Sequence, residues 1–336
     1  MNFIDYSLLI FIIINISLVV NFKKIKLFHY IIDKPDKQRK LHLRQIPLAG
    51  GIILIINVLI YFIIANIDER YILTEIFYNN KFEFSIFIFT TFIIFFIGLF
   101  DDKYDLSPNY KFLLLSITIL IILAFDNNLI ISTIKFSFID KTINFKQYNI
   151  IFTCFCFLVF LNAFNMFDGI NLQASFYSII ILIFIIILYG SSIFINILLI
   201  FLVCYSVLNY KNKSFLGDNG SLLIAFIIGY IFIKLYNVEK IAYTDEVFIF
   251  MIIPGVDLIR LFFMRILNKQ NPLRGDRNHL HHLVSKKFSL IQSTIIIQLS
   301  IILPLFMMYI GTNKLLIIII TIFCYFLLLY KLKKIS

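Results

Sequence analysis

The sequence predicts an all-α, polytopic integral membrane protein with about eleven transmembrane helices, and three observations lead to this class. The chain has 336 residues, of which 61% are hydrophobic, and its mean hydropathy is +0.95, more than a water-soluble domain carries. Its apolar residues form separate runs close to the roughly 20 residues that cross a bilayer as a helix. Its charged residues lie mainly between these runs.

Eleven apolar runs are predicted to span the membrane. In chain order they cover approximately residues 3–22, 46–66, 84–100, 112–125, 149–165, 173–189, 191–207, 221–236, 246–266, 289–311 and 314–330. The first run lacks the features of a cleaved signal peptide, so we expect it to be retained. Residues 129–147 alternate apolar and polar side chains, which indicates a small β-hairpin outside the bilayer.

The positive charges predict the orientation of the chain. With eleven spans the two termini lie on opposite sides, and the loops after odd-numbered spans plus the C-terminal tail contain 21 of the 30 Lys and Arg residues. Because basic loops stay on the cytoplasmic side, we expect the N-terminus outside, the C-terminus in the cytoplasm and the hairpin in the periplasm. The net charge of +11 follows from this topology, and no nucleic-acid partner is expected, since the charges form no basic domain.

The chain is predicted to be a single membrane domain, residues 1–336, with its polar motifs on one face. These motifs lie in cytoplasmic loops at about residues 23–45, 101–111, 166–172, 208–220 and 267–288. Polar side chains next to hydrocarbon cost free energy, so their concentration on one side indicates a functional site.

Carboxylates in two of these loops are candidates for a divalent-cation site. Asp101 and Asp102 are adjacent at a helix end, and Asp105 lies one turn further on if the helix continues. Asp218 opens a span between two glycines, which let backbone N–H groups approach an anion. Mg²⁺ typically binds one or two carboxylates together with substrate phosphates. Each motif alone also has a plainer interpretation, a solvated helix cap or an ordinary N-cap.

Amide and basic side chains in the other loops are candidates for binding a phosphorylated substrate. The spacing of Asn162, Asn165 and Asp168 would present them as one polar stripe at a helix end. A histidine cluster with neighbouring arginines fits an anion site better than a metal site; its members are His279, His281, His282, Arg274 and Arg277. Attraction to lipid headgroups is the alternative for a basic loop. Together the five motifs indicate a site for Mg²⁺ with a diphosphate.

In this order the motifs resemble those of the polyprenyl-phosphate N-acetylhexosamine-1-phosphate transferases, the MraY/WecA family. The resemblance extends over residues 33–282. Its motifs are Asp33-x-Pro35, Arg39-Lys40-x-His42, Pro47-x-x-Gly50-Gly51, Asp101-Asp102-x-x-Asp105, Asn162-x-x-Asn165-x-x-Asp168-Gly169, Gly217-Asp218-x-Gly220-Ser221, Pro254-x-x-Asp257 and Asp276-Arg277-x-His279-x-His281-His282. The histidine spacing is similar to that of the WecA branch.

The resemblance implies an enzyme of the plasma (inner) membrane whose active site faces the cytoplasm. It would transfer an N-acetylhexosamine 1-phosphate, with N-acetylglucosamine as the expected sugar, from a UDP-sugar to undecaprenyl phosphate. The reaction releases UMP and starts a cell-surface glycan such as lipopolysaccharide O-antigen or a cell-wall polymer. The implied cofactor is Mg²⁺, with Mn²⁺ as a substitute. The implied partners are UDP-N-acetylhexosamine, polyprenyl phosphate and the bilayer, and a homodimer is left open.

Carried over residue by residue, the resemblance makes Asp218 the metal ligand and Asp101 and Asp102 the catalytic residues that position or deprotonate the lipid phosphate. The implied substrate-binding residues are Arg39, Lys40, His42, Asn165, Asp168, Asn171, Asn209, Arg277, His279, His281 and His282. One departure stands out: the family continues Asp-Gly-x-Asp-Gly-Leu-Ala, whereas residues 168–174 read Asp-Gly-Ile-Asn-Leu-Gln-Ala. We expect this change to affect nucleotide or sugar preference more than catalysis.

Two alternatives remain at this point. A phospho-MurNAc-pentapeptide transferase of peptidoglycan synthesis would need a roomier sugar and peptide site, and the histidines of that branch are consecutive. A multi-span transporter would place its site near the bilayer midplane, often between internal repeats. The sequence shows no such repeats, and Asp257 and Arg260 are the midplane charges we find in it.

Overall fold

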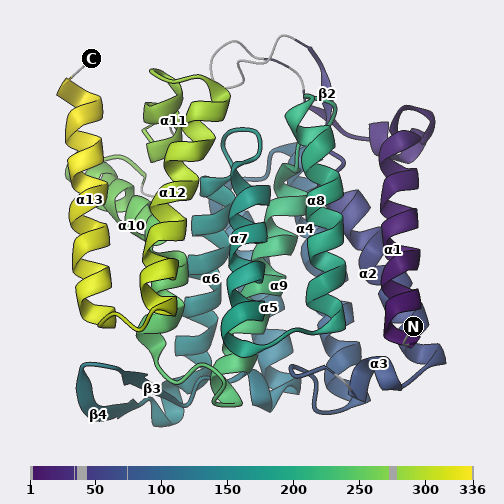
Figure 1. Cartoon of the computed structure of the whole chain (residues 1–336), viewed down its shortest axis with the longest axis horizontal. Coiled ribbons are helices and arrows are strands. Elements are labelled where there is room, and N and C mark those ends of the chain that lie inside the picture. The colour runs from purple at the N-terminus through teal and green to yellow at the C-terminus, as the bar shows by residue number, and fades with distance from the viewer. Residues whose placement is uncertain (1–2, 34, 36–43, 74, 272–277, 335–336) are drawn as a thin grey trace.

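The computed structural model describes residues 3–33, 35, 44–73, 75–271 and 278–334, most of which are helical (Figure 1). The helices and strands are α1 (Phe3–Val20), β1 (Ile32–Asp33), β2 (Ile46–Pro47), α2 (Gly50–Ile67), α3 (Arg70–Leu73), α4 (Lys81–Tyr104), α5 (Pro108–Phe125), β3 (Thr133–Phe136), β4 (Ile139–Asn144), α6 (Asn149–Phe167), α7 (Gln173–Tyr189), α8 (Ile193–Tyr210), α9 (Gly217–Asn237), α10 (Thr244–Leu267), α11 (Leu280–Ser285), α12 (Leu290–Tyr309) and α13 (Lys314–Lys334).

Each of the eleven predicted spans coincides with one long helix among the described residues. Nine of these helices are long and apolar enough to cross a membrane. The other two, α1 and α7, are shorter apolar helices, and the apolar stretch of α1 is Tyr6–Val20. The all-α polytopic class is therefore confirmed, while the number of crossings and their orientation stay predictions.

Helix α9 is the centre of the fold. Its apolar window is 94% buried inside the protein, against 28% for α5 and α13. It packs against α2, α4 and α6, and Figure 1 shows it in the middle of the bundle. A helix that is apolar on all sides requires such complete covering by its neighbours. The first residues of α9 consequently lie where several helix ends meet.

A buried ionic network fixes the other end of α9. The Lys234 ammonium lies 2.7 Å from Glu83 Oε2 at the start of α4 and 2.8 Å from Asp126 Oδ1 after α5. The hydroxyl of Tyr230 donates to the second oxygen of Asp126 at 3.1 Å. Removing one partner of such a buried network typically costs about 3–5 kcal/mol, so this network ties α9 to α4 and α5.

The predicted hairpin is present as the antiparallel strands β3 and β4, with Thr133 opposite Asn144. Figure 1 places it at the same end of the bundle as the N-terminus, whereas the C-terminus, β2 and α11 lie at the opposite end. This arrangement agrees with an odd number of crossings. The periplasmic location of the hairpin stays a prediction.

Cysteine labelling tests which end of the bundle faces the cytoplasm. In a background with the four native cysteines replaced by alanine, Lys103→Cys, Lys213→Cys and Asn278→Cys place exposed thiols beside three motifs. Since basic loops stay inside, a membrane-impermeant maleimide should label none of them in intact cells and all three after lysis. Lys141→Cys in the exposed strand β4 is the control and should react from outside. External labelling of any of the first three would contradict the topology.

Candidate active site at the start of α9

Two glycines allow α2 and α4 to approach the first turn of α9. A Cβ atom on Gly98 of α4 would lie 2.5 Å from Asn219 Cα, and one on Gly51 of α2 would lie 2.0 Å from Asn219 Oδ1. Since Cβ atoms do not come this close to other atoms, only glycine permits these contacts. The close approach brings Asp101 and Asp102, at the end of α4, next to Asp218.

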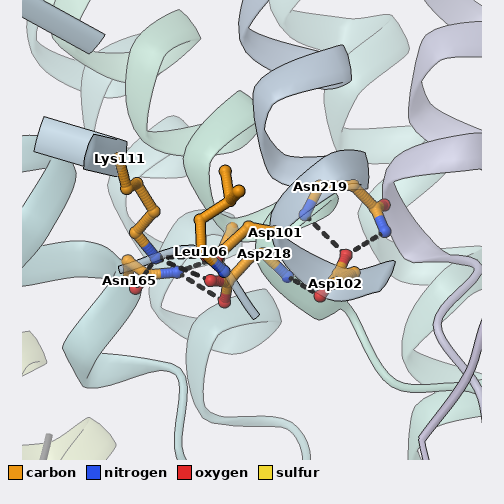
Figure 2. A network of polar contacts seen from close by, with 8 residues as sticks. Asp101, Asp102, Leu106, Lys111, Asn165, Asp218 and Asn219 are labelled. Carbon is orange, nitrogen blue, oxygen red and sulfur yellow. Dashed lines mark hydrogen bonds and ion pairs between the residues drawn. The ribbon is translucent and has the colours of Figure 1, made fainter. Parts of the chain in front are cut away.

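Asp102 caps the N-terminus of α9. Its Oδ1 accepts a hydrogen bond from the Asp218 N–H at 2.8 Å, and its Oδ2 accepts one from the Asn219 N–H at 2.9 Å. The side-chain amide of Asn219 also donates to Oδ2 (Figure 2). Free N–H groups and the helix dipole make a helix N-terminus an anion site. The anion expected at this glycine turn is therefore the chain's own Asp102 carboxylate.

Three oxygen-bearing side chains converge on the ammonium group of Lys111, in the first turn of α5. Its Nζ lies 2.6 Å from Asp101 Oδ2 and 2.7 Å from Asp218 Oδ2, and it donates to Asn165 Oδ1 at 3.5 Å. The amide of Asn165 in turn donates to Asp218 Oδ1 at 2.9 Å. Figure 2 shows these side chains pointing toward one another from α4, α5, α6 and α9.

This oxygen cluster fits a Mg²⁺ ion that also binds substrate. Asp218 is the accessible carboxylate, with 34% of its side chain exposed against 7% for Asp101. Within the described part of the chain no group of three or more His, Cys, Asp or Glu side chains forms a metal cage. Two carboxylates and an amide oxygen suit Mg²⁺, which takes its remaining ligands from water and phosphates. In this structure the Lys111 ammonium supplies the positive charge that balances the Asp101 and Asp218 carboxylates.

Lys111 is the residue of this cluster that the sequence did not reveal. A lysine in the first turn of an apolar span is usually an interfacial anchor, and only the fold shows that it lies between two aspartates. Asp105, by contrast, stays outside the cluster. Helix α4 ends at Tyr104, and Asp105 is exposed in a left-handed conformation with φ 51°, so the helix does not continue to present it on the same face.

Asp168 lies just beyond the end of α6. Burial, reinforced by repulsion from the Asp218 carboxylate, raises the pKa of Asp168 to about 7. The next residue, Gly169, makes room for a histidine: a Cβ atom there would lie 1.9 Å from His281 Nε2. The nucleotide motif and the histidine motif, more than 100 residues apart in the sequence, therefore meet at Gly169.

The three histidines of the cluster occupy different environments. His281 is 1% exposed, and neither of its ring nitrogens has a hydrogen-bond partner among the residues that the structure describes. Burial, followed by repulsion from His282 and His279, lowers the pKa of His281 well below its usual value, so this ring is neutral. His279 instead pairs its Nδ1 with Asp257 Oδ2 at 2.8 Å, and His282 is half-buried.

Asn171 and Asn209 form hydrogen bonds between the turn before α7 and the end of α8. The Asn171 amide donates to the Asn209 carbonyl at 3.0 Å, and Asn209 Oδ1 accepts from the Leu172 N–H at 2.6 Å. Leu172 has φ 68°, where the family pattern has glycine; this left-handed conformation costs a side chain on the order of 1 kcal/mol. The two amides thus join the turn before α7 to the loop after α8. Their contacts with a nucleotide stay predictions.

The structure brings part of the predicted site together in space. Asp101, Asp102, Asn165 and Asp218 meet at the start of α9, and the histidines adjoin the neighbouring Asp168 turn. Four predicted substrate-binding residues fall outside the described residues, namely Arg39, Lys40, His42 and Arg277.

Comparison with known proteins finds a family model that matches part of the chain. The model of Glycosyl transferase family 4 matches residues 84–236, the segment that carries Asp101, Asp102, Lys111, Asn165, Asp168 and Asp218. This match and the relatives described below agree with the resemblance that the motifs indicate.

These relatives are called undecaprenyl-phosphate alpha-N-acetylglucosaminyl 1-phosphate transferase. The protein of Escherichia coli O157:H7 is 25% identical over an alignment of 268 residues, with 76% of this chain and 69% of the relative covered. That of Yersinia pestis is 26% identical, with 76% and 70% covered. That of Thermotoga maritima is 27% identical over 263 residues, with 76% and 73% covered.

Replacing Lys111 tests whether the cluster is a cation site. In Lys111→Met the Asp101 and Asp218 carboxylates face each other without a counter-charge, which should lower stability by on the order of 3 kcal/mol. Because a divalent cation can replace the lost charge, Mg²⁺ should raise the apparent Tm of this variant more than that of the wild type. The exposed Lys103→Met is the control. An equal response to Mg²⁺ in all three proteins would refute the assignment.

The raised pKa of Asp168 predicts a pH-dependent stability. An unfolded aspartate ionises near pH 4, whereas the folded Asp168 ionises at about pH 7, so the folded state loses stability as pH rises between these values. Asp168→Asn should remove this penalty and raise the apparent Tm clearly at pH 8, less at pH 5 and hardly at pH 4. Asp140→Asn, on the exposed strand β4, serves as the control. If the variant were no more stable than the wild type at pH 8, the ionised Asp168 carboxylate would not destabilise the folded state, and the prediction would be wrong.

Proposed function

We propose that this protein transfers N-acetylglucosamine 1-phosphate from UDP-N-acetylglucosamine to undecaprenyl phosphate and releases UMP, at the cytoplasmic face of the plasma membrane. The observation that carries the proposal is the convergence of Asp101, Asn165 and Asp218 on one cationic centre at the end of the bundle's central helix. The names of the relatives support the same donor sugar and carrier lipid.

In this reaction an oxygen of the lipid phosphate forms a bond to the sugar-linked phosphorus as the phosphoanhydride bond to UMP breaks. We assign Asp101 to position or deprotonate the lipid phosphate, because it lies in the last turn of α4 within the cluster. Asp102 holds the first turn of α9, and thereby Asp218, in place. Asp218, with Asp101 and the Asn165 oxygen, would hold Mg²⁺, which when bound neutralises charge on the diphosphate. Mn²⁺ is the proposed substitute.

The histidine segment supplies the complementary positive charge. We assign Arg277 and His281 or His282 to the diphosphate and Asp168 to the nucleotide. Negative charge grows on the leaving UMP oxygen, so a donor placed there stabilises the transition state more than the ground state. Asn171, in place of the family's carboxylate, offers an amide that can both donate and accept and is a candidate for tuning nucleotide preference.

The competing functions are less well supported. The relatives' names indicate N-acetylglucosamine, not the muramyl pentapeptide of peptidoglycan synthesis. A transporter would place its polar cluster near the midplane, whereas this cluster lies at helix ends. The glycan that the product starts, whether O-antigen or a cell-wall polymer, and a homodimeric state remain predictions.

An assay on purified protein tests the proposal. With UDP-N-acetylglucosamine and undecaprenyl phosphate, the protein should form a lipid-linked diphospho-sugar and UMP. EDTA should abolish the activity, and Mg²⁺ or Mn²⁺ should restore it. Asp218→Asn should lower kcat by on the order of 10²-fold or more, because an amide replaces the accessible carboxylate.

The substrate panel and a control variant make the assay selective. UDP-N-acetylgalactosamine, UDP-glucose and UDP-MurNAc-pentapeptide should each be used less efficiently. Asp140→Asn should retain full activity, since Asp140 lies on the exposed hairpin. Metal-independent turnover, or preference for the pentapeptide, would refute the proposed function.

A further inference from the structure

A second buried carboxylate, Asp257, lies in α10 outside the α9 cluster. It is 3% exposed, and a buried carboxylate is retained only when its oxygens are paired. Its Oδ1 accepts from Arg260 Nη2 at 2.8 Å and from the Tyr325 hydroxyl of α13 at 2.6 Å. Its Oδ2 faces His279 Nδ1 at 2.8 Å. The group therefore joins α10 and α13 to the histidine segment.

The backbone around His279 is fixed by the same pair of α10 residues. Arg260 Nη2 donates to the Asn278 carbonyl at 2.7 Å, and the Leu280 N–H donates to Asp257 Oδ1 at 3.2 Å. The segment from Asn278 to Leu280 is thus held on both sides of His279. Together with the contact between Nδ1 and Asp257, this fixation holds the His279 ring in the orientation that the structure shows.

The His279 ring reaches from Asp257 toward the predicted substrate region. It stacks on His281 with ring centroids 5.4 Å apart and an interplanar angle of 7°. His281 in turn packs against Gly169, next to Asp168. His279 and Asp257 also line a narrow hollow with residues of α6 and α10, namely Ala163, Met166, Phe167, Pro254 and Leu258.

We infer that Asp257 is a positioning residue for the transfer reaction: it fixes the Nδ1 proton of His279 and makes this ring the cationic member of the three histidines, with Nε2 available to the diphosphate. The inference rests on the proposed function. A carboxylate that accepts from Nδ1 both sets the tautomer of a histidine and stabilises its charged form. With Arg260 and a protonated His279 on one carboxylate, the group carries net positive charge, which suits a diphosphate.

The neighbours of His279 support this division of roles. Among the described residues, the titratable or charged groups that face it are Asp257 and Arg260 from α10, Tyr325 from α13, and His281 and His282 from α11. Of these groups only Asp257 carries negative charge near neutral pH. His281 is buried without a hydrogen-bond partner among the described residues and serves as a neutral ring between His279 and Gly169.

The first test is Asp257→Asn, which keeps the shape and removes the charge. We expect kcat/KM for UDP-N-acetylglucosamine to fall at least 10-fold with the KM for undecaprenyl phosphate unchanged. The alkaline limb of its pH profile should move to lower pH by one unit or more, and Asp257→Glu should restore most of this shift. Asp245→Asn is the matched control: it lies in the same helix, is 1% exposed, and binds Ser137 at the opposite end. Its pH profile should match that of the wild type.

A double-mutant cycle shows whether Asp257 acts through His279. If it does, Asp257→Asn combined with His279→Gln should be no slower than His279→Gln alone. Additive losses, or a lowered Tm with an unchanged pH profile, would reduce Asp257 to a purely structural role and overturn the inference.

Nitrogen-15 NMR of labelled histidine makes the inference independent of activity. The His279 signals are identified by their loss in His279→Gln. In the wild type they should report a charged ring up to a higher pH than in Asp257→Asn. Equal titration in both proteins would overturn the inference even if the transferase assay succeeds. Conversely, a clear difference in a protein that does not transfer the sugar phosphate would leave the charge assignment intact and refute the proposed function.

Discussion

The contact between the end of α4 and the start of α9 is the constraint on which the rest of the site depends. Asp102 satisfies two backbone N–H groups of α9, and in a low-dielectric surrounding such groups cannot remain unpaired. Because this carboxylate is used as a cap, its neighbour Asp101 turns toward Lys111 and Asp218. The two adjacent aspartates thus have different surroundings: Asp102 caps α9, and Asp101 faces Lys111 and Asp218.

Much of the fold was predictable because bilayer-length apolar runs leave little choice of structure. The hairpin was predictable from its alternating pattern. The aspartates and asparagines of the site were found through the family motifs, which give residue types in order. Lys111 was not found, because its partners lie 10 and 107 residues away and its own neighbourhood resembles an interfacial anchor. The bonds from Asn171 to the Asn209 carbonyl and from the Leu172 N–H to the Asn209 side chain could not be predicted either, since an amide's partner depends on how two loops meet.

The candidate site has two halves that come from different parts of the chain. The carboxylate half is built by residues of α4, α5, α6 and α9 that lie within the family match at residues 84–236. The histidine half is built by α10, α11 and α13, which hold the histidines through Asp257 and Tyr325. The halves meet where Gly169 admits His281. A substrate with a metal-bound diphosphate suits this junction, because it carries both a cation and residual negative charge.

Helices α4 and α9 are fastened to each other at both ends: Asp102 binds the start of α9, and Glu83, 19 positions earlier in α4, binds Lys234 near the end of α9. The distance between the two contacts along α4 must therefore match the distance between them along the antiparallel α9. One residue inserted in either helix would shift the following part of that helix by about 1.5 Å and rotate it by about 100°. This change would break either the contact of Asp102 or the contact of Glu83. Substitutions in the apolar stretch between the two contacts can accumulate. Insertions and deletions there are expected only when both helices change together. This part of the core should therefore diverge in composition among relatives while keeping its length.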